Sequence, residues 1–120
     1  MLYTLKWGDV VFEKNLEIGF LLDFYGDVLS ERKRTVLDYY YNMDFSLAEI
    51  ALEIGISRQG VRELIKKAEE ELSFYEEKLG LAKRFRTAQK NAEELLLLLD
   101  GAQVNPQIRT AAEELAKSVR

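Results

Sequence analysis

The residues best suited to chemistry lie near the middle of the chain, and their chemistry is nucleic-acid binding. Arg side chains can pair with guanine, Gln with adenine, and Lys or Arg with phosphate. A Ser hydroxyl and the first backbone amides of a helix can hold a phosphate. The candidate DNA-binding residues are Ser57, Arg58, Gln59, Arg62, Lys66 and Lys67, with Arg32, Lys33 and Arg34 as an extension of the patch. The alternative is that they form an ordinary solvated helix face.

Composition removes most enzymatic chemistry. The 120 residues include no Cys and no His, so thiolate metal sites and Ser-His or Cys-His dyads cannot form. Carboxylate-pair hydrolysis and Mg²⁺ chemistry stay formally open. However, neighbouring carboxylates on a helix point in different directions, so Glu69–Glu71 and Glu93–Glu94 are expected to be solvated. We therefore expect a protein that is not an enzyme and holds no metal or cofactor.

The overall charge is acidic, with 17 Lys and Arg against 21 Asp and Glu and a net charge of −4. Any DNA contact must therefore come from a local basic patch. The glutamates at 69–71 and 76–77 count against strong binding because they would repel a phosphate backbone. The N-terminus lacks a signal-peptide pattern, and the longest apolar run, Leu95–Leu99, is too short to span a membrane. These features indicate a cytoplasmic protein.

The elements that must position the candidate residues are helices, because apolar residues recur every three or four positions and the chain has one proline. The sequence predicts an all-α fold of five or six helices. The first is expected to bury Leu16, Phe20, Leu21, Phe24 and Val28, and Trp7 is expected to pack an N-terminal arm onto a helix. The predicted helices span about 13–28, from Ser30 to about 41, from Ser46 to 54, 58–79, 81–100 and 106–119.

A helix-turn-helix motif is the strongest local pattern. Ser46 and Glu49 form a capping box, and Ala51 is small enough for a close helix crossing. Gly55 supplies the positive φ that the turn needs. Gly60 lies inside the second helix, where it either permits a close backbone approach or is simply tolerated. The shared core is expected to contain Ile50, Ile54, Ile56, Val61 and Leu64.

The chain is expected to divide into an N-terminal extension (1–16), a helix-turn-helix domain (17–80) and C-terminal helices (81–120). Leu95–Leu99 place apolar side chains all round a helix, which is more than one neighbouring helix can cover. The sequence therefore predicts a homodimer formed through the C-terminal helices.

Several segments together resemble the YlxM family of small bacterial helix-turn-helix proteins, which are similar to region 4 of sigma factors. The matching segments are Leu22–Tyr25, Leu29–Arg32, Tyr39–Tyr41, Phe45–Ala51, Ser57–Val61 and Tyr75–Leu79, within about 17–83. The resemblance implies a cytosolic protein that acts in, or regulates, the signal recognition particle (SRP) targeting pathway. The chain departs from the family pattern in residues 1–16, at Gly60, where Ala is usual, and beyond about Arg84.

Two functions stay open at this point. The favoured one is a DNA-binding regulatory protein that contacts duplex DNA. The alternative is a protein-interaction adaptor that binds an SRP component without DNA contact. The aromatic residues could stack bases, but their helical spacing favours core packing; they are Phe24, Tyr25, Tyr39, Tyr40, Tyr41 and Phe45.

Overall fold

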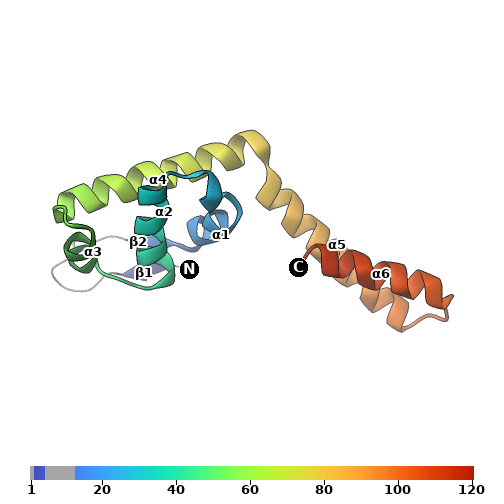
Figure 1. Cartoon of the computed structure of the whole chain (residues 1–120). Helices are drawn as coiled ribbons and strands as arrows, with labels where there is room; N and C mark the ends of the chain where they lie inside the picture. The colour runs from blue at the N-terminus through green and yellow to red at the C-terminus, as the bar shows by residue number, and fades with distance from the viewer. Residues whose placement is uncertain (1, 5–12) are drawn as a thin grey trace. The chain divides into compact units, whose positions relative to one another are not determined.

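Helices dominate the computed structural model, which describes residues 2–4 and 13–120 (Figure 1). The predicted all-α fold is confirmed, with one short strand pair added. Within the described residues, no helix combines the length and apolar character that crossing a bilayer requires. The elements are β1 (Leu2–Thr4), β2 (Glu13–Asn15), α1 (Leu16–Tyr25), the 3-10 turn η1 (Gly26–Val28), α2 (Glu31–Leu37), the π-helical turn η2 (Asp38–Asn42), α3 (Leu47–Ile54), α4 (Arg58–Leu79), α5 (Leu81–Asp100) and α6 (Pro106–Ser118).

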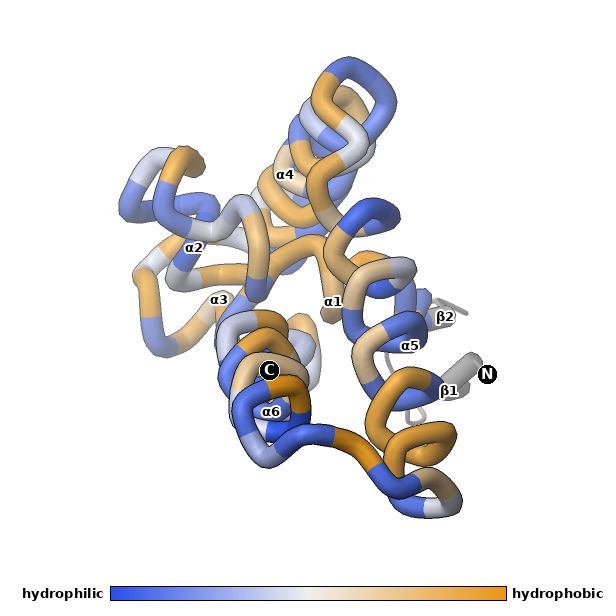
Figure 2. The backbone as a smooth tube through the Cα atoms, turned by 90° about the vertical axis from the view of Figure 1, so that its right-hand side faces the viewer, coloured by the Kyte–Doolittle hydropathy of each residue, from blue (hydrophilic) through white to orange (hydrophobic). Residues whose placement is uncertain are grey.

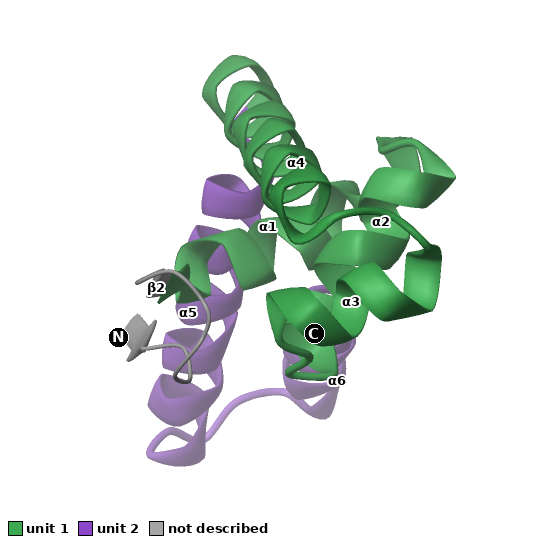
Figure 3. Cartoon of the chain, turned by 90° about the vertical axis from the view of Figure 1, so that its left-hand side faces the viewer, with its two compact units in different colours: residues 1–79 green, residues 80–120 purple. Residues whose placement is uncertain are grey.

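The chain forms two compact units, which are coloured separately in Figure 3. Unit 1 is Met1–Leu79 and unit 2 is Gly80–Arg120. In unit 1, α4 packs against α1, α2 and α3. In unit 2, α5 packs against α6. Gly80 follows the last residue of α4 with φ 63°, a left-handed conformation that ends the helix at low steric cost.

The core of unit 1 is organised by one face of α4. Val61, Ile65, Ala68 and Leu72 are spaced by four, three and four residues, and each is fully buried. This spacing places them on one side of the helix, facing the three helices that α4 packs against. The same apolar spacing continues in the sequence through Tyr75 to Leu79, but the Leu79 side chain is 48% exposed, so the buried face ends before it. The other fully buried large side chains are Val36, Leu37, Tyr40, Leu47 and Ile50.

The predicted first helix is wrong at both ends. Glu13–Asn15 form β2, which pairs antiparallel with β1, and Gly26–Val28 form a 3-10 turn. Asn15 is the N-cap of α1, and its Oδ1 accepts from the Glu17 amide at 2.9 Å. The inward face is also shifted, since Leu16 and Val28 are exposed. The buried residues of α1 are Ile18, Leu21, Leu22 and Tyr25. Trp7 lies outside the described residues.

Unit 2 is a helical hairpin with a small core. Its helix starts agree with the prediction: Asn105 caps α6, with its Oδ1 accepting from the Gln107 amide at 2.8 Å, and Pro106 is the first helical residue. Arg109 ties the two helices, donating to Asp100 at 3.0 Å and to a backbone carbonyl at 2.7 Å. Small side chains allow the helices to approach closely; the buried residues are Ala82, Ala92, Leu99, Ala112 and Ala116.

Candidate nucleic-acid interface

The helix-turn-helix is built from α3, a glycine turn and the start of α4. At the start of α3, the Ser46 amide donates to Glu49 Oε1 at 2.9 Å and the Glu49 amide donates to Ser46 Oγ at 3.1 Å. Both halves of the predicted capping box are therefore formed. At its end, Gly55 adopts φ 75° and donates its amide to the Ala51 carbonyl at 2.9 Å. The turn has the left-handed glycine that the sequence predicts.

Packing between α3 and α4 fixes the start of α4. Ile50, Val61 and Ile65 are completely buried, and Ala51 is 9% exposed. The other predicted core members, Ile54, Ile56 and Leu64, are half-buried. Because α3 is held on this buried face, the opposite side of the first turns of α4 is left to solvent.

Gly60 occupies a crowded position at the entry to α4. Its amide donates to Ser57 Oγ at 2.9 Å, so Ser57 caps this helix. A Cβ at Gly60 would lie 3.2 Å from that oxygen and 3.3 Å from Cδ1 of Ile56. The crowding at Gly60 thus comes from side chains of the preceding turn and not from an approaching backbone. The Ser57 hydroxyl proton is not used by this cap, so it can be donated to a phosphate.

The candidate residues on α4 differ in accessibility. Arg58, Gln59, Lys66 and Lys67 are exposed, whereas Arg62 is half-buried. The Nε atom of Arg62 is buried and has no hydrogen-bond partner among the described residues. Gln59 Nε2 donates to Oε1 of Glu63 at 3.0 Å. Reading a base with Gln59 therefore requires this exposed contact to break, which costs little in water.

The predicted extension on α2 is mostly engaged within the chain. Lys33 Nζ lies 2.8 Å from Glu71 Oε1, and both side chains are about a quarter exposed, at 27% and 26%. The hydrogen bond from Lys33 lowers the pKa of the Glu71 carboxyl. Arg34 lies 2.9 Å from Asp27 in an exposed pair. Arg32 is exposed. The structure thus leaves fewer cations of α2 available to phosphate than the sequence indicates.

The prediction that Glu69–Glu71 form a simple solvated face is wrong for two of the three. Tyr41 donates to the half-buried Glu69, and Tyr75 donates to Glu71 at 3.0 Å. Further along α4, Tyr25 donates to Glu76 at 2.7 Å. Burial raises the pKa of Glu69, and burial together with the bond to Glu69 raises the pKa of Tyr41. Glu69 therefore links α4 to η2 and Glu76 links α4 to α1, and the sequence pattern does not reveal either contact.

A buried lysine that the sequence did not single out anchors the approach to the motif. Lys14 on β2 is 3% exposed, and its Nζ lies 2.5 Å from Asp44 Oδ1. The same ammonium lies 4.5 Å from the centroid of the Tyr40 ring. Asp44 has φ 56° and lies two residues before the N-cap of α3. The contact therefore ties the strand pair to the loop that leads into the helix-turn-helix.

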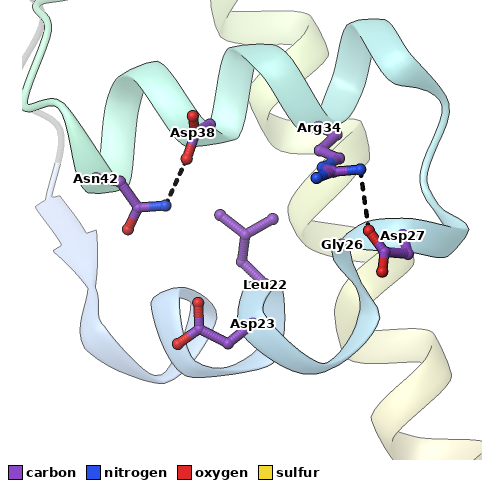
Figure 4. A pocket seen from close by; sticks show the side chains of 7 residues that line it. All are labelled: Leu22, Asp23, Gly26, Asp27, Arg34, Asp38 and Asn42. Atoms are coloured by element: carbon purple, nitrogen blue, oxygen red, sulfur yellow. Dashed lines mark hydrogen bonds and ion pairs between the residues drawn. The ribbon is translucent and has the colours of Figure 1, made fainter.

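A cavity between α1 and the α2–η2 segment has an acidic lining (Figure 4). Arg34 is paired with Asp27 there, and Asn42 Nδ2 donates to Asp38 Oδ1 at 2.6 Å. No group of three potential metal ligands occurs among the residues that the structure describes. The lining residues are Leu22, Asp23, Gly26, Asp27, Arg34, Asp38 and Asn42.

Comparison with known proteins identifies the family. The family model described as "Putative helix-turn-helix protein, YlxM / p13 like" matches residues 12–114. The chain belongs to this family. The match extends past the 17–83 range of the resemblance at both ends and takes in most of unit 2. The YlxM / p13-like family is one of helix-turn-helix proteins and not an enzyme family.

Relatives in this family come from several bacteria. A UPF0122 protein of Desulforamulus reducens is 44% identical over 85 residues, which cover 71% of this chain and 73% of the relative. One from Thermoanaerobacter sp. is 37% identical over 102 residues, covering 82% and 87%. One from Acetivibrio thermocellus is 37% identical over 116 residues, covering 88% and 99%. The similarity to the last of these spans nearly its whole length.

Proposed function

We propose that this YlxM / p13-like protein is a cytoplasmic, non-enzymatic regulator that binds duplex DNA through the start of α4 and takes part in the SRP targeting pathway. The observation that carries the DNA-binding part is the closed helix-turn-helix with an exposed, Ser57-capped helix start. Helix N-termini attract phosphate, and in this motif the second helix enters the major groove. The pathway assignment follows from the family resemblance.

Five of the candidate residues have distinct roles in this mechanism. Ser57 donates its hydroxyl to a phosphate and sets the depth of α4 in the groove. Gln59 and Arg62 reach base edges, while Lys66 and Lys67 neutralise backbone charge.

A salt titration of binding to random-sequence duplex DNA tests this function. The four cations at the start of α4 are Arg58, Arg62, Lys66 and Lys67. At about 0.9 unit each, they predict that log K falls against log salt with a slope between about −3 and −4. Arg62→Ala should make the slope shallower by about one unit. Lys78→Ala is the matched control, since it removes the same charge from the far end of α4. Absence of binding at low salt would refute the proposal.

The second candidate function is a protein-interaction adaptor that binds an SRP component without DNA. It is favoured by the net charge of −4 and by the ion pairs of Lys33 and Arg34. A pull-down from lysate, with and without nuclease, separates the two. Capture of SRP components that survives nuclease supports the adaptor, whereas loss of all partners on nuclease treatment supports the DNA-binding regulator.

The working form of this regulator is a homodimer formed through unit 2. Leu97 and Leu98 on α5 are 71% and 73% exposed, and Leu115 on α6 is 50% exposed. Burying such side chains in a second copy is favourable by about 25 cal/mol per Å². One helix-turn-helix also reads only a short half-site, so two copies read a longer one. Mass measurement should give twice the 13.9 kDa of the chain, and Leu97→Glu should halve it. A wild-type monomer would refute the dimer.

A further inference from the structure

A shallow groove lies between α1 and the later turns of α4, and its volume is about 730 Å³. Ile18 contributes to it from α1 and is 7% exposed, whereas Phe74 contributes from α4 and is 54% exposed. Of the candidate DNA-binding residues, this groove includes Lys66 alone. We call this surface the α1–α4 groove; its lining residues are Asn15, Ile18, Lys66, Glu69, Glu70, Ser73, Phe74 and Glu77.

One face of α4 places an aromatic ring between two carboxylates. Glu70 and Glu77 are seven residues apart, and Phe74 lies four residues after the first and three before the second. This spacing puts all three on the same side of the helix, and all three are exposed. Hydrophobic and hydrophilic residues alternate along α4 in Figure 2. The groove therefore combines an apolar surface with negative charge on both sides of it.

The two carboxylates beside Phe74 differ from the other glutamates of this segment. Glu69, Glu71 and Glu76 each accept a hydrogen bond from a tyrosine of unit 1. Within the described part of the chain, no side-chain hydrogen bond or ion pair involves Glu70 or Glu77. These two carboxylates can therefore pair with a ligand without breaking a contact inside the protein.

The Phe74 ring is suited to a cationic side chain. Lys78 Nζ lies 5.7 Å from the centroid of this ring, and the Tyr75 ring lies edge-on to it at 6.1 Å. A contact between an exposed lysine and an exposed ring is weak, so a partner can displace it. An Arg guanidinium can stack on an aromatic face and pair with a neighbouring carboxylate at the same time.

Charge decides which class of partner fits the α1–α4 groove. Unit 1 contains ten Lys and Arg against sixteen Asp and Glu, so a nucleic acid or an anionic lipid surface is repelled from its acidic side. We propose that the α1–α4 groove docks a basic amphipathic helix of a partner protein, with an apolar side chain beside Phe74 and Arg or Lys side chains against Glu70 and Glu77.

This inference rests on the adaptor function proposed above and names its docking surface and the chemistry of its partner. Seven residues of helix rise by about 10 Å at ~1.5 Å per residue. Two cations that are seven residues apart on a partner helix therefore match the separation of Glu70 and Glu77. Helix-in-groove recognition of this kind uses apolar anchors spaced by three and four residues.

The test titrates the full chain with two helical peptides in a calorimeter. The first peptide has about 18 residues, which is about five turns, and carries a Leu stripe flanked by Arg residues seven positions apart. The second has Glu in place of every Arg. The groove variants are the double variant Glu70→Gln with Glu77→Gln and the single variant Phe74→Ala.

Each groove variant has a matched control. Glu93→Gln with Glu94→Gln removes the same charge from exposed positions of unit 2. Leu52→Ala removes a side chain of α3 that is 86% exposed. Circular dichroism melting checks that all variants fold, and backbone-amide NMR of the wild-type chain maps where the peptide binds.

The Arg peptide should bind the wild-type chain and shift the amides of Glu70–Glu77, whereas the Glu peptide should not bind. The double variant should weaken binding of the Arg peptide about three- to tenfold, and Phe74→Ala about tenfold. Each control should change it by less than about twofold. Equal affinities of the groove variants and their controls, or no binding of the Arg peptide, would overturn the inference.

The pull-down with nuclease separates this inference from the adaptor function on which it rests. Partners that survive nuclease should be lost from both groove variants and kept by both controls. Undiminished capture by the groove variants would overturn the docking site and leave the adaptor function standing. Loss of all partners on nuclease treatment would overturn both. A wild-type dimer that Phe74→Ala converts to a monomer would also overturn the inference, because a second copy would then occupy the groove.

Discussion

Replacing Gly55 tests whether the turn between α3 and α4 depends on its left-handed backbone. Gly55 has φ 75°, and a Cβ built there meets nothing within 4 Å. The cost of Gly55→Ala is therefore conformational and not a clash. A left-handed non-glycine residue costs about 1–2 kcal/mol, and Ala regains about 0.4–1 kcal/mol by restricting the unfolded chain. We expect a net loss of about 1 kcal/mol.

Thermal unfolding followed by circular dichroism measures this loss. For a folding unit the size of unit 1, 1 kcal/mol lowers the melting temperature by about 4–8 °C. Gly55→Asn should lose less, because Asn tolerates the left-handed region. Gly19→Ala is the matched control in the same unit: it lies within α1, its Cβ would be 3.8 Å from Tyr41 Cδ1, and the helix gains about 1 kcal/mol. The reasoning fails if Gly55→Ala melts no lower than wild type, or no lower than Gly55→Asn.

Three further predictions concern unit 1. Ala51→Leu should lower the free energy of unfolding by about 1–3 kcal/mol in urea, because the larger side chain overpacks the α3–α4 contact. Ala48→Leu on the exposed side of α3 should be nearly neutral. Equal effects of the two substitutions would contradict the close packing of α3 on α4 at Ala51. Burial raises the pKa of Glu69 above its ordinary 4.5, so the folded state binds this proton more tightly and stability should fall as pH rises from about 4.5 through the folded-state pKa. Glu69→Gln should flatten this decrease in stability, and an unchanged pH profile in the variant would show that Glu69 does not cause it. Asp44→Asn should cost about 1 kcal/mol in the same assay, because it leaves the buried ammonium of Lys14 beside a neutral partner that is itself exposed; a neutral result would show that the pair is not an anchor.

The parts of the fold that could be predicted are those set by neighbours in sequence. The capping box at Ser46, the glycine turn at Gly55 and the cap at Asn105 each depend on residues within a few positions of one another. Helix periodicity likewise placed both ends of α4 and the buried residues of its first half. Such local signals are physical causes of the structure, so reading them from the sequence is reliable.

The parts that could not be predicted depend on partners far away in the chain. Glu13–Asn15 continue the helical pattern, yet they pair with Leu2–Thr4 as a strand. The Lys14–Asp44 contact joins residues thirty positions apart, and the Tyr25–Glu76 bond joins residues fifty-one apart. The sequence indicates that α2 carries cations, but only the fold shows that Lys33 is already paired. Charge on a helix predicts a binding surface only when its intramolecular partners are known.

The central claim is that the exposed start of α4 is the surface that enters DNA. The most direct measurement is a backbone-amide NMR titration of the full chain with a short duplex. The account predicts that the largest shift changes fall on Ser57–Lys66 and that the amides around the acidic cavity beside Asp23 do not change. Unchanged amides over Ser57–Lys66 at saturating DNA would contradict it.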